Sequence, residues 1–549
     1  MASQDHPQHE PGLTPGAHPD RRRPEGDGSG DEGGAHGGGG MGMRGVTRPM
    51  AEKQMRQHHE QMNDDGEENG DDDGGMSEPY SDGRYEMLRM HHRQTLWVYW
   101  TLVLLGLWQL VAPFTFGYLN EALWVDPSGG RGVWFSEDPR TELRAWLMTW
   151  SDVVSGLLLV VFGWRSLKPD RPVSRWICCF VGIWLTLAPL VFWAPTAASY
   201  LNATFVGMLV IALAILIPGM PNMPVYMKMG GDLPPGWSYN PSSWPQRWIM
   251  IATGFVGFLA SRYLGAFQLG YLDTIWDPFF GGGTRQVLNS DMSHMWPVSD
   301  AALGTFAYTF EFLMGWMGAP SRWRTMPWMV TFFGILVIPL GLIHIFLVIS
   351  QPVVVGFWCT FCLLAAAIML PMIPLEVDEV VAMGQHVKRS MDKGTSFWTA
   401  FWKGGPADEV GDDERSPALA KLPDEPGAVL KASVWGMSVP WTLAVSTALG
   451  IGIVFLPGLF GAEGTASDML VVGGLLIVTV SVIAFGEVVR AGRFLNVLLG
   501  LGVAALPWVY GAPTMASVLA TITGFAVAAL AVPRGPKTET YGSWDRFVR

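Results

Sequence analysis

The sequence predicts an all-α, polytopic membrane protein of about 12 transmembrane helices, arranged as 4+4+4 around a central four-helix bundle. Hydrophobic residues make up 49% of its 549 residues and charged residues only 15%, whereas soluble domains carry roughly 25% charged residues. Beyond Gln94, apolar runs close to the roughly 20 residues that cross hydrocarbon recur along the chain. Lys and Arg gather in alternate short loops, which is typical of a multi-pass membrane protein.

Residues 1–93 differ from the rest of the chain, because they are rich in Gly, Asp, Glu, His and Arg and contain almost no aliphatic cluster. Such a segment cannot bury enough apolar surface to offset the entropy lost on ordering, so we predict a disordered cytoplasmic tail. The net charge of −12 comes largely from this tail and from the loop at 407–425. So acidic a chain is a poor partner for nucleic acid.

The membrane spans follow from the apolar runs and from the polar residues between them. In chain order, the predicted spans are 95–116, 144–164, 175–194, 201–219, 247–266, 300–318, 327–350, 354–373, 434–457, 468–487, 493–510 and 514–532. With the N-terminus in the cytoplasm, basic residues such as Arg165, Lys168 and Arg322 fall in inward loops. The outward loops without Lys or Arg are 195–200, 351–353, 458–467 and 511–513. We therefore predict a cell-membrane protein with both termini cytoplasmic, including a tail at 534–549.

An internal repeat marks the first and last blocks, predicted at 94–220 and 434–533. Four helices share a Gly-x6-Pro frame near their outer ends, and each is followed by a second helix that contains glycine. The four frames run from Gly106 to Pro113, Gly182 to Pro189, Gly450 to Pro457 and Gly500 to Pro507. Proline ends a helix at the interface, and small residues let two helix backbones approach closely in lipid. The frame therefore predicts four helical hairpins.

These hairpins resemble a known family in three short segments around their prolines. The segments are 111–117, which reads Val-Ala-Pro-Phe-Thr-Phe-Gly, 187–193, which reads Leu-Ala-Pro-Leu-Val-Phe-Trp, and 506–511, which reads Leu-Pro-Trp-Val-Tyr-Gly. They are similar to the SPW repeat, a bacterial membrane hairpin named for a Ser-Pro-Trp signature. Ala or Leu stands in place of the Ser, and only the last segment keeps the Trp. The resemblance implies a hairpin embedded in membrane lipid and implies no chemistry.

The middle region does not follow this repeat and carries a pair of cysteines. Its four spans have a long outward loop, 267–299, between the first two, and the fourth begins at Trp358-Cys-Thr-Phe-Cys362. A spacing of three places both thiols on one helix face, within reach of a disulfide. At the outward end of the helix a disulfide can persist, and the helix N-terminus favours the reactive thiolate. Thiol redox chemistry and simple packing of two small hydrophobic side chains both remain open.

Other roles for the cysteines are less favoured by their surroundings. A structural zinc site, and with it any bound metal, is disfavoured because no second Cys or His pair lies near Cys359 and Cys362 at ligand spacing. The adjacent Cys178 and Cys179 lie near the cytoplasmic end of an SPW-like helix. We predict that these two are packing residues.

The four spans, the long loop and the Cys-x-x-Cys motif together resemble the vitamin K epoxide reductase family over about 245–375. The likeness extends to the run Val287-Leu-Asn-Ser290 and to a helix start in which Asp300, Gly304 and Tyr308 are spaced by four. The family's bacterial members are membrane thiol–quinone oxidoreductases, each a four-helix bundle that holds a quinone beside the cysteine pair. The resemblance implies two-electron transfer between thiols and a quinone of the menaquinone or ubiquinone type.

The same resemblance implies a role for each matching residue. Cys359 and Cys362 would be the catalytic pair, with Cys362 facing the quinone and Cys359 exchanging with thiols. Ser290 matches the loop serine of the family. Asp300 stands where an Asn commonly hydrogen-bonds a quinone carbonyl, and Tyr308 lies on the same helix; these three are the predicted quinone-binding residues.

The sequence also departs from the family in its outward loop. Two shuttle cysteines are expected at Thr284 and near Trp276, and the loop contains no cysteine at all. At Asp300 an ionised carboxylate would repel a quinone carbonyl, whereas a protonated one could donate to it. Either the pair exchanges directly with an extracytoplasmic thiol–disulfide protein, or the domain keeps its fold without turnover.

Two further polar residues in the middle region each have two possible roles. His294 in the loop could relay protons for quinone reduction, or it could be a solvated loop residue. Glu311 lies deep in an apolar span, where it could be a proton or hydrogen-bond site or could join helices. The segment 376–433 is predicted to be a cytoplasmic linker, with a short amphipathic helix over 377–391 before a Pro- and acid-rich stretch.

The leading hypothesis is therefore a membrane oxidoreductase that couples Cys359 and Cys362 to a quinone. A different hypothesis is a non-catalytic scaffold or sensor that retains the fold, which the missing loop thiols favour. A transporter with as many spans is disfavoured, because transporters commonly contain matched halves and the three blocks here are unlike.

Overall fold

The computed structural model describes residues 89–127, 141–169, 171–217, 230–406 and 411–548. This part of the chain is helical, and its only bridges between extended segments are two isolated ones, Trp237 to Tyr541 and Met437 to Gly486. The predicted disordered tail, except for 89–93, lies outside the described residues.

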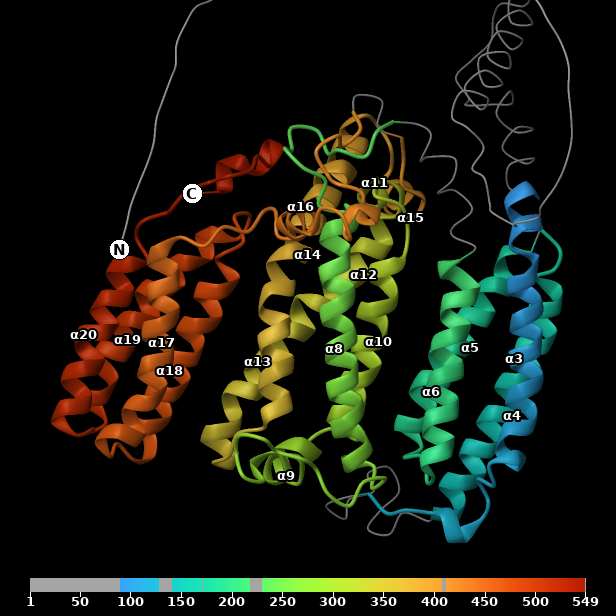
Figure 1. The fold of residues 1–549 in the computed structure, drawn as a ribbon, viewed down its shortest axis with the longest axis horizontal. Helices are drawn as coiled ribbons and strands as arrows, with labels where there is room; N and C mark the ends of the chain where they lie inside the picture. Colours follow the sequence, from blue (N-terminus) through green and yellow to red (C-terminus); the bar gives the residue numbers. More distant parts are fainter. Residues whose placement is uncertain (1–88, 128–140, 170, 218–229, 407–410, 549) are drawn as a thin grey trace, which may run out of the picture. The chain divides into compact units, whose positions relative to one another are not determined.

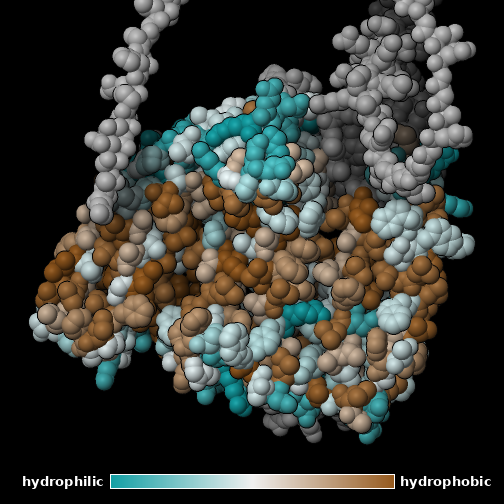
Figure 2. Space-filling model, in the orientation of Figure 1, coloured by the Kyte–Doolittle hydropathy of each residue, from teal (hydrophilic) through white to brown (hydrophobic). Residues whose placement is uncertain are grey.

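Ten helices in the described ranges are long and apolar enough to cross a membrane, which confirms the polytopic helical fold. Two more predicted spans correspond to shorter helices of 17 residues each, α10 (Asp300–Trp316) and α20 (Thr514–Leu530). The layout of 12 spans in three blocks of four therefore stays a prediction. Figure 2 shows hydrophobic residues covering the visible faces of the helices, with hydrophilic residues gathered over the loops.

The first block consists of two helical hairpins (Figure 1). Helix α3 (Leu96–Thr115) packs on α4 (Thr141–Arg165), and α5 (Pro172–Val191) packs on α6 (Ala197–Ile211). A short π-helix, η2 (Ala212–Leu216), extends α6. Cys178 and Cys179 of α5 are buried and unbonded in the hydrophobic core, in agreement with their predicted packing role.

The glycines of the predicted repeat lie where the two helices of a hairpin cross. A Cβ atom added to Gly106 would lie 2.8 Å from the carbonyl oxygen of Gly156, and one added to Gly207 would lie 2.6 Å from that of Gly182. No side chain fits at such distances. The backbones of each hairpin are therefore in direct contact, as the Gly-x6-Pro frame predicts.

The last block repeats this arrangement. Helix α17 (Trp441–Phe460) packs on α18 (Gly464–Ile483), and α19 (Leu495–Val509) packs on α20. Gly450 and Gly474 mark the first crossing in this block, and Gly500 and Gly524 mark the second. The same local sequence thus produces the same close crossing four times in the described chain.

The central bundle is built from α8 (Trp244–Gln268), α10, α12 (Pro327–Val337), α13 (Pro339–Ser350) and α14 (Thr360–Asp392). The predicted span 327–350 is divided into α12 and α13. Proline at the start of α13 has no N–H to donate and restricts the residue before it, so the helix is interrupted there.

Helix α14 is longer than its predicted span of 354–373. It begins at Thr360 and continues to Asp392 without a break, so the amphipathic helix predicted over 377–391 is its continuation. Pro371 and Pro374 lie inside this helix. Prolines are tolerated in membrane helices because neighbouring groups compensate for the lost hydrogen bonds.

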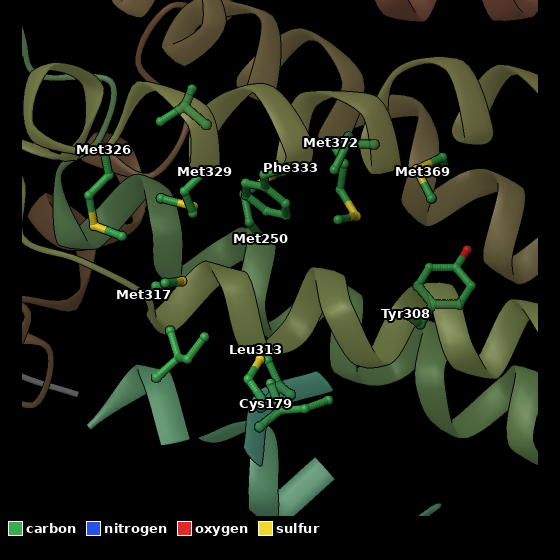
Figure 3. Close-up of a cluster of buried hydrophobic side chains, with 14 of the residues drawn as sticks. Cys179, Met250, Tyr308, Leu313, Met317, Met326, Met329, Phe333, Met369 and Met372 are labelled. Atoms are coloured by element: carbon green, nitrogen blue, oxygen red, sulfur yellow. The ribbon is translucent and has the colours of Figure 1, made fainter. Parts of the chain in front are cut away.

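Methionine side chains fill much of the interior of the bundle (Figure 3). Met250 of α8, Met329 of α12 and Met372 of α14 are at most 4% exposed. Leu313 of α10 lies in the same core, and Cys179 of α5 adjoins it. Unbranched thioether side chains adapt to irregular gaps, and here they make the middle of the bundle apolar.

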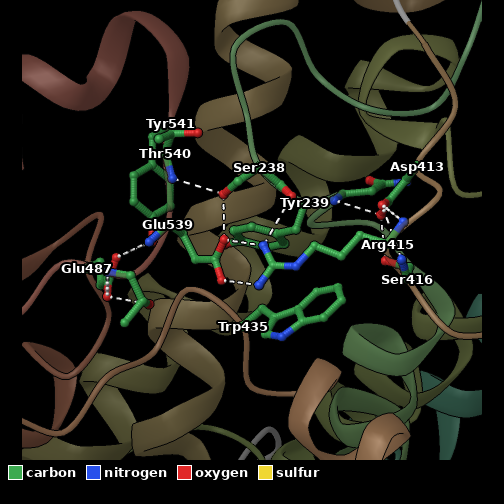
Figure 4. A network of polar contacts seen from close by, with 12 residues as sticks. Ser238, Tyr239, Asp413, Arg415, Ser416, Trp435, Glu487, Glu539, Thr540 and Tyr541 are labelled. Carbon is green, nitrogen blue, oxygen red and sulfur yellow. Dashed lines mark hydrogen bonds and ion pairs between the residues drawn. The ribbon is translucent and has the colours of Figure 1, made fainter. Parts of the chain in front are cut away.

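A polar network covers the end of the bundle at which α14 finishes (Figure 4). The two guanidinium nitrogens of Arg415 contact the carboxylate of Glu539 at 2.5 and 2.7 Å. The Arg415 guanidinium also stacks 4.2 Å from the ring of Trp435, and Ser238 donates to Glu539. The C-terminal segment is thereby attached to the linker that the sequence places in the cytoplasm.

Candidate redox site at Cys359 and Cys362

The two cysteines form a disulfide across the first turn of α14. Their Cα atoms are 5.2 Å apart. Cys359 caps the helix, and its sulfur accepts a hydrogen bond from the N–H of Cys362 at 3.2 Å. The Cys359 side chain is fully buried, whereas Cys362 is partly exposed. The pair that the sequence predicts on one helix face is therefore in bonding contact.

The chain preceding the pair fixes the position of the Cys359 backbone. A short π-helix, η4 (Gln351–Val355), ends at Gly356, whose φ of 78° suits a residue without a side chain. The amide oxygen of Gln351 then accepts a hydrogen bond from the N–H of Cys359 at 3.1 Å. Gln351 is 3% exposed and was not among the predicted site residues.

The outward loop is attached to the other side of the pair through Asp277. Its carboxylate accepts hydrogen bonds from the Thr360 hydroxyl at 2.7 Å, the Thr284 N–H at 2.8 Å and the Phe280 N–H at 3.0 Å. Desolvation would raise the pKa of Asp277, but these hydrogen bonds lower it well below its usual range. An ionised aspartate thus connects the loop to the start of α14.

The two loop positions where shuttle cysteines are expected both lie beside the pair. The Thr284 hydroxyl accepts a hydrogen bond from the N–H of Thr360, between the two cysteines, at 3.2 Å. The ring centroid of Trp276 is 6.3 Å from that of Phe361, which lies within the Cys-x-x-Cys turn. The loop therefore has the position that a shuttle requires, but it carries a hydroxyl and an indole in place of thiols.

A short loop helix, α9 (Gly283–Leu288), covers Cys359. Val287 and Leu288 of α9 pack with Leu264 and Phe267 of α8 in one buried cluster that includes Cys359. This apolar cover explains why the sulfur has no exposed surface. A protein thiol can reach Cys359 only when the loop moves.

The three predicted quinone-binding residues lie in different surroundings. The Tyr308 hydroxyl lies 3.4 Å from Nδ1 of His344 and 3.5 Å from the carbonyl oxygen of Ala365. Asp300 accepts hydrogen bonds from the Ser293 hydroxyl at 3.1 Å and from the Ala301 N–H at 2.8 Å.

Ser290 donates to the carbonyl oxygen of Val287 at 2.6 Å. Its own carbonyl oxygen lies 2.9 Å from Nδ1 of His294. Ser290 and Asp300 thus hold the loop, whereas Tyr308 faces the interior of the bundle. Only Tyr308 of the three is linked toward the cysteine pair, through His344.

His344 is a site residue that the sequence analysis missed. It lies on α13 and interacts with the backbone of Cys362, while its ring also meets Tyr308. A histidine alone in a strongly apolar span was the available signal, because ionisable groups are rare in the membrane.

Aromatic side chains lie on two sides of the Cys-x-x-Cys turn. The Tyr308 ring fills the space at Gly257, where any Cβ would overlap it. Its hydroxyl makes only long contacts and can donate to another acceptor. On the other side, Tyr263 packs edge-on against Phe361 with ring centroids 5.2 Å apart.

A cavity of about 370 Å³ lies between α6 and α8, next to this aromatic pair. It is lined by Tyr263 together with Tyr200, Tyr271 and Arg262. Tyr263 therefore stands between the cavity and the Cys-x-x-Cys turn. An apolar ligand could approach the turn from this side of the bundle.

Comparison with protein-family models finds both predicted resemblances. Residues 248–377 match the Vitamin K epoxide reductase family, and residues 132–217 match the SPW repeat domain. No curated protein and no solved structure gives a significant match. The assignment of the last block to the same repeat stays a prediction that its glycine crossings support. The central bundle match supports a membrane thiol–disulfide oxidoreductase function. The chain thus contains a vitamin K epoxide reductase family domain preceded by an SPW repeat domain.

Proposed function

We propose that this protein is a membrane oxidoreductase that transfers two electrons between the Cys359–Cys362 pair and a quinone. The observation that carries the proposal is the disulfide at the start of α14 inside the bundle that matches the family. A menaquinone- or ubiquinone-type molecule, when bound, would supply an acceptor for two electrons and two protons. The protein would lie in the cell membrane with both termini in the cytoplasm.

Each residue of the site has a distinct role in this proposal. Cys359 exchanges with an extracytoplasmic thiol–disulfide protein after α9 moves away from it. Cys362, which is partly exposed and lies near His344, exchanges electrons with the quinone. The Tyr308 hydroxyl orients a quinone carbonyl, and the apolar cover of the loop excludes water from the pair between encounters.

The experiment is a quinone-reduction assay of the purified protein in detergent with a reduced dithiol peptide as electron donor. Cys359→Ser and Cys362→Ser should each abolish turnover, because neither single thiol can form the disulfide. Cys178→Ser and Cys179→Ser, which alter buried cysteines of α5, should retain it. Equal activity in all four variants would refute the mechanism. Mass spectrometry of the oxidised wild-type protein should recover Cys359 bonded to Cys362.

The alternative is a non-catalytic scaffold or sensor that keeps the fold. It is favoured by Thr284 and Trp276, which occupy the two positions where shuttle cysteines are expected. In a Cys362→Ser background, an active enzyme should trap an extracytoplasmic protein as a mixed disulfide with Cys359. No turnover by the wild-type protein, together with no partner trapped by the Cys362→Ser variant, would support the scaffold.

A further inference from the structure

Ionisable side chains form a line through the central bundle, from its predicted cytoplasmic end to the cysteine pair. The line begins at Glu379 of α14, which forms an ion pair with Arg322 of α11 (Arg322–Thr325). Both side chains are at most 3% exposed. Ser242 also donates to Glu379. This carboxylate is therefore charged and fully partnered, as a buried ion must be.

Glu376 lies one turn further into the membrane on the same helix. It is 1% exposed, and its Oε1 atom has no hydrogen-bond partner among the described residues. A Cβ added to Gly334 of α12 would lie 3.9 Å from that oxygen and 2.7 Å from Cγ2 of Val380, so α12 packs closely against α14 beside Glu376. Glu376 interacts electrostatically with Glu379, Arg322, Glu311 and Asp378.

Glu311 of α10 is the next member of the line. It is 1% exposed, and its Oε2 atom also lacks a partner in the described part of the chain. A Cβ added to Gly254 of α8 would lie 3.7 Å from the Cβ of Glu311, so α8 packs closely behind it. Helix α12 contributes no ionisable side chain to this region. A buried carboxyl without an ion-pair partner costs least as the neutral acid, which can hold and pass on a proton.

Tyr308 and His344 complete the line to the redox pair. Tyr308 precedes Glu311 by one helical turn and interacts with it electrostatically. The Tyr308 hydroxyl lies 3.4 Å from His344, which in turn interacts with the backbone of Cys362. From Glu376 to Cys362 the line spans about 21 Å along α14.

We propose that Glu376 and Glu311 conduct protons from the predicted cytoplasmic side to the quinone site. The inference deepens the proposed function and rests on it. Oxidation of two thiols to one disulfide yields two electrons and two protons, and those protons leave on the outward side. Two other protons arrive through Glu376 and Glu311 and join the two electrons at the quinone oxygens. Each turnover would therefore remove two protons from the inner side and release two outside.

The test uses the full-length protein in liposomes that contain menaquinone and a pH-sensitive dye in the lumen. A membrane-impermeant dithiol peptide added outside addresses only molecules whose cysteine end faces outward. Their predicted cytoplasmic end then faces the lumen, so turnover should make the lumen alkaline by two protons per quinol formed. Quinol formation is followed separately by its ultraviolet absorbance.

In the variants Glu376→Gln and Glu311→Gln, the rate of proton uptake from the lumen should fall by roughly 100-fold. Glu311→Asp, which keeps the carboxyl, should recover part of it. Asp152→Asn is the matched control, because Asp152 is a buried carboxyl of α4 outside the line. It should leave both measurements unchanged.

The possible results separate this inference from the proposed function. No quinol formation by the wild-type protein would refute the proposed function. Quinol formation without an alkaline lumen, or full proton uptake in both glutamine variants, would overturn the proton path alone. A reduced-minus-oxidised infrared difference spectrum recorded without quinone is a second measurement, which does not depend on turnover. The reduced-minus-oxidised spectrum should contain a carboxyl band that Glu311→Gln removes, and a band unchanged by that substitution would count against the path.

Discussion

Among single residues, Thr284 lies against the Cys-x-x-Cys turn, at a position where the family resemblance implies a cysteine. Its hydroxyl is 3.2 Å from the N–H of Thr360. The contact stabilises the closed loop, whereas a thiol there could exchange with Cys359. An oxygen at this position can therefore hold the loop closed, whereas a sulfur there could take part in electron transfer.

Introducing a thiol at this position tests the geometry. In a Cys362→Ser background, Thr284→Cys should form a disulfide with Cys359 on mild oxidation, because the two side chains adjoin the same turn. Peptide mass spectrometry would detect the cross-link. Thr274→Cys, at an exposed site in the same loop, is the control and should not cross-link. A free, alkylatable thiol at both positions would contradict the observed packing of the loop.

Asp277 should control how often the loop opens. Hydrogen bonds to a charged group contribute about 1.5–3 kcal/mol each, so Asp277→Asn should speed alkylation of reduced Cys359 by roughly tenfold or more in the Cys362→Ser background. The alkylation rate with a small maleimide is the measurement. Thr274→Ser, elsewhere in the loop, should leave that rate unchanged.

The pH dependence of loop closure follows from the lowered pKa of Asp277. Because the folded-state pKa of Asp277 is lowered, its carboxylate stabilises the closed loop fully above the unfolded-state pKa of roughly 3.9. This stabilisation is lost as the pH falls toward the folded-state pKa. The ratio of alkylation rates between Asp277→Asn and wild type should therefore stay constant from about pH 5 to about pH 8. A ratio that falls steeply within this window would show that Asp277 is not the ionised anchor.

At the scale of helices, the glycine crossings set the geometry of the hairpins. Gly450→Ala would place a Cβ 2.9 Å from the carbonyl oxygen of Gly474, which should lower stability by about 1–3 kcal/mol. Gly452→Ala lies on the same helix with nothing within 4 Å, so it should be neutral or slightly stabilising. Thermal unfolding of the two variants in detergent gives the comparison. Equal melting temperatures would show that the crossing tolerates a side chain.

Local patterns in the sequence were enough to predict the hairpins and the cysteine pair. The Gly-x6-Pro frame lies within one helix, and Cys359 and Cys362 are one turn apart, so short-range spacing identifies both. Gln351 and His344 were missed because their importance depends on tertiary contacts with the start of α14. The isolated histidine in an apolar span marks an unusual residue, but no local pattern shows which groups it or Gln351 contacts.

The extent of α14 was also beyond local reasoning. Pro371 and Pro374 favour a break between a membrane span and a separate amphipathic helix. In the structure, the helix passes through both prolines and continues to Asp392. It packs on α12 and α13, and also on α11 and α15 (Phe397–Lys403). Tertiary packing along its whole length thus outweighs the local cost of the prolines.

At the scale of the whole molecule, the orientation in the membrane can be tested with single cysteines. In a background with all four native cysteines replaced by Ser, Phe279→Cys in the outward loop should react with an impermeant maleimide in intact cells. Lys421→Cys, in the predicted cytoplasmic linker, should react only after the membrane is permeabilised. Both positions are exposed, so access to the reagent decides the result. The reverse pattern would invert the orientation and with it the site of thiol exchange.

The outward loop has a kinetic consequence, because 267–299 supplies no second cysteine pair. The proposed enzyme could store one electron pair at a time, in Cys359 and Cys362, and no internal reservoir would let a second donor load before the first pair has been discharged. Donor and acceptor must then alternate. Initial rates measured over a grid of dithiol and quinone concentrations should give parallel double-reciprocal lines, and intersecting lines would mean that both substrates bind before either product leaves.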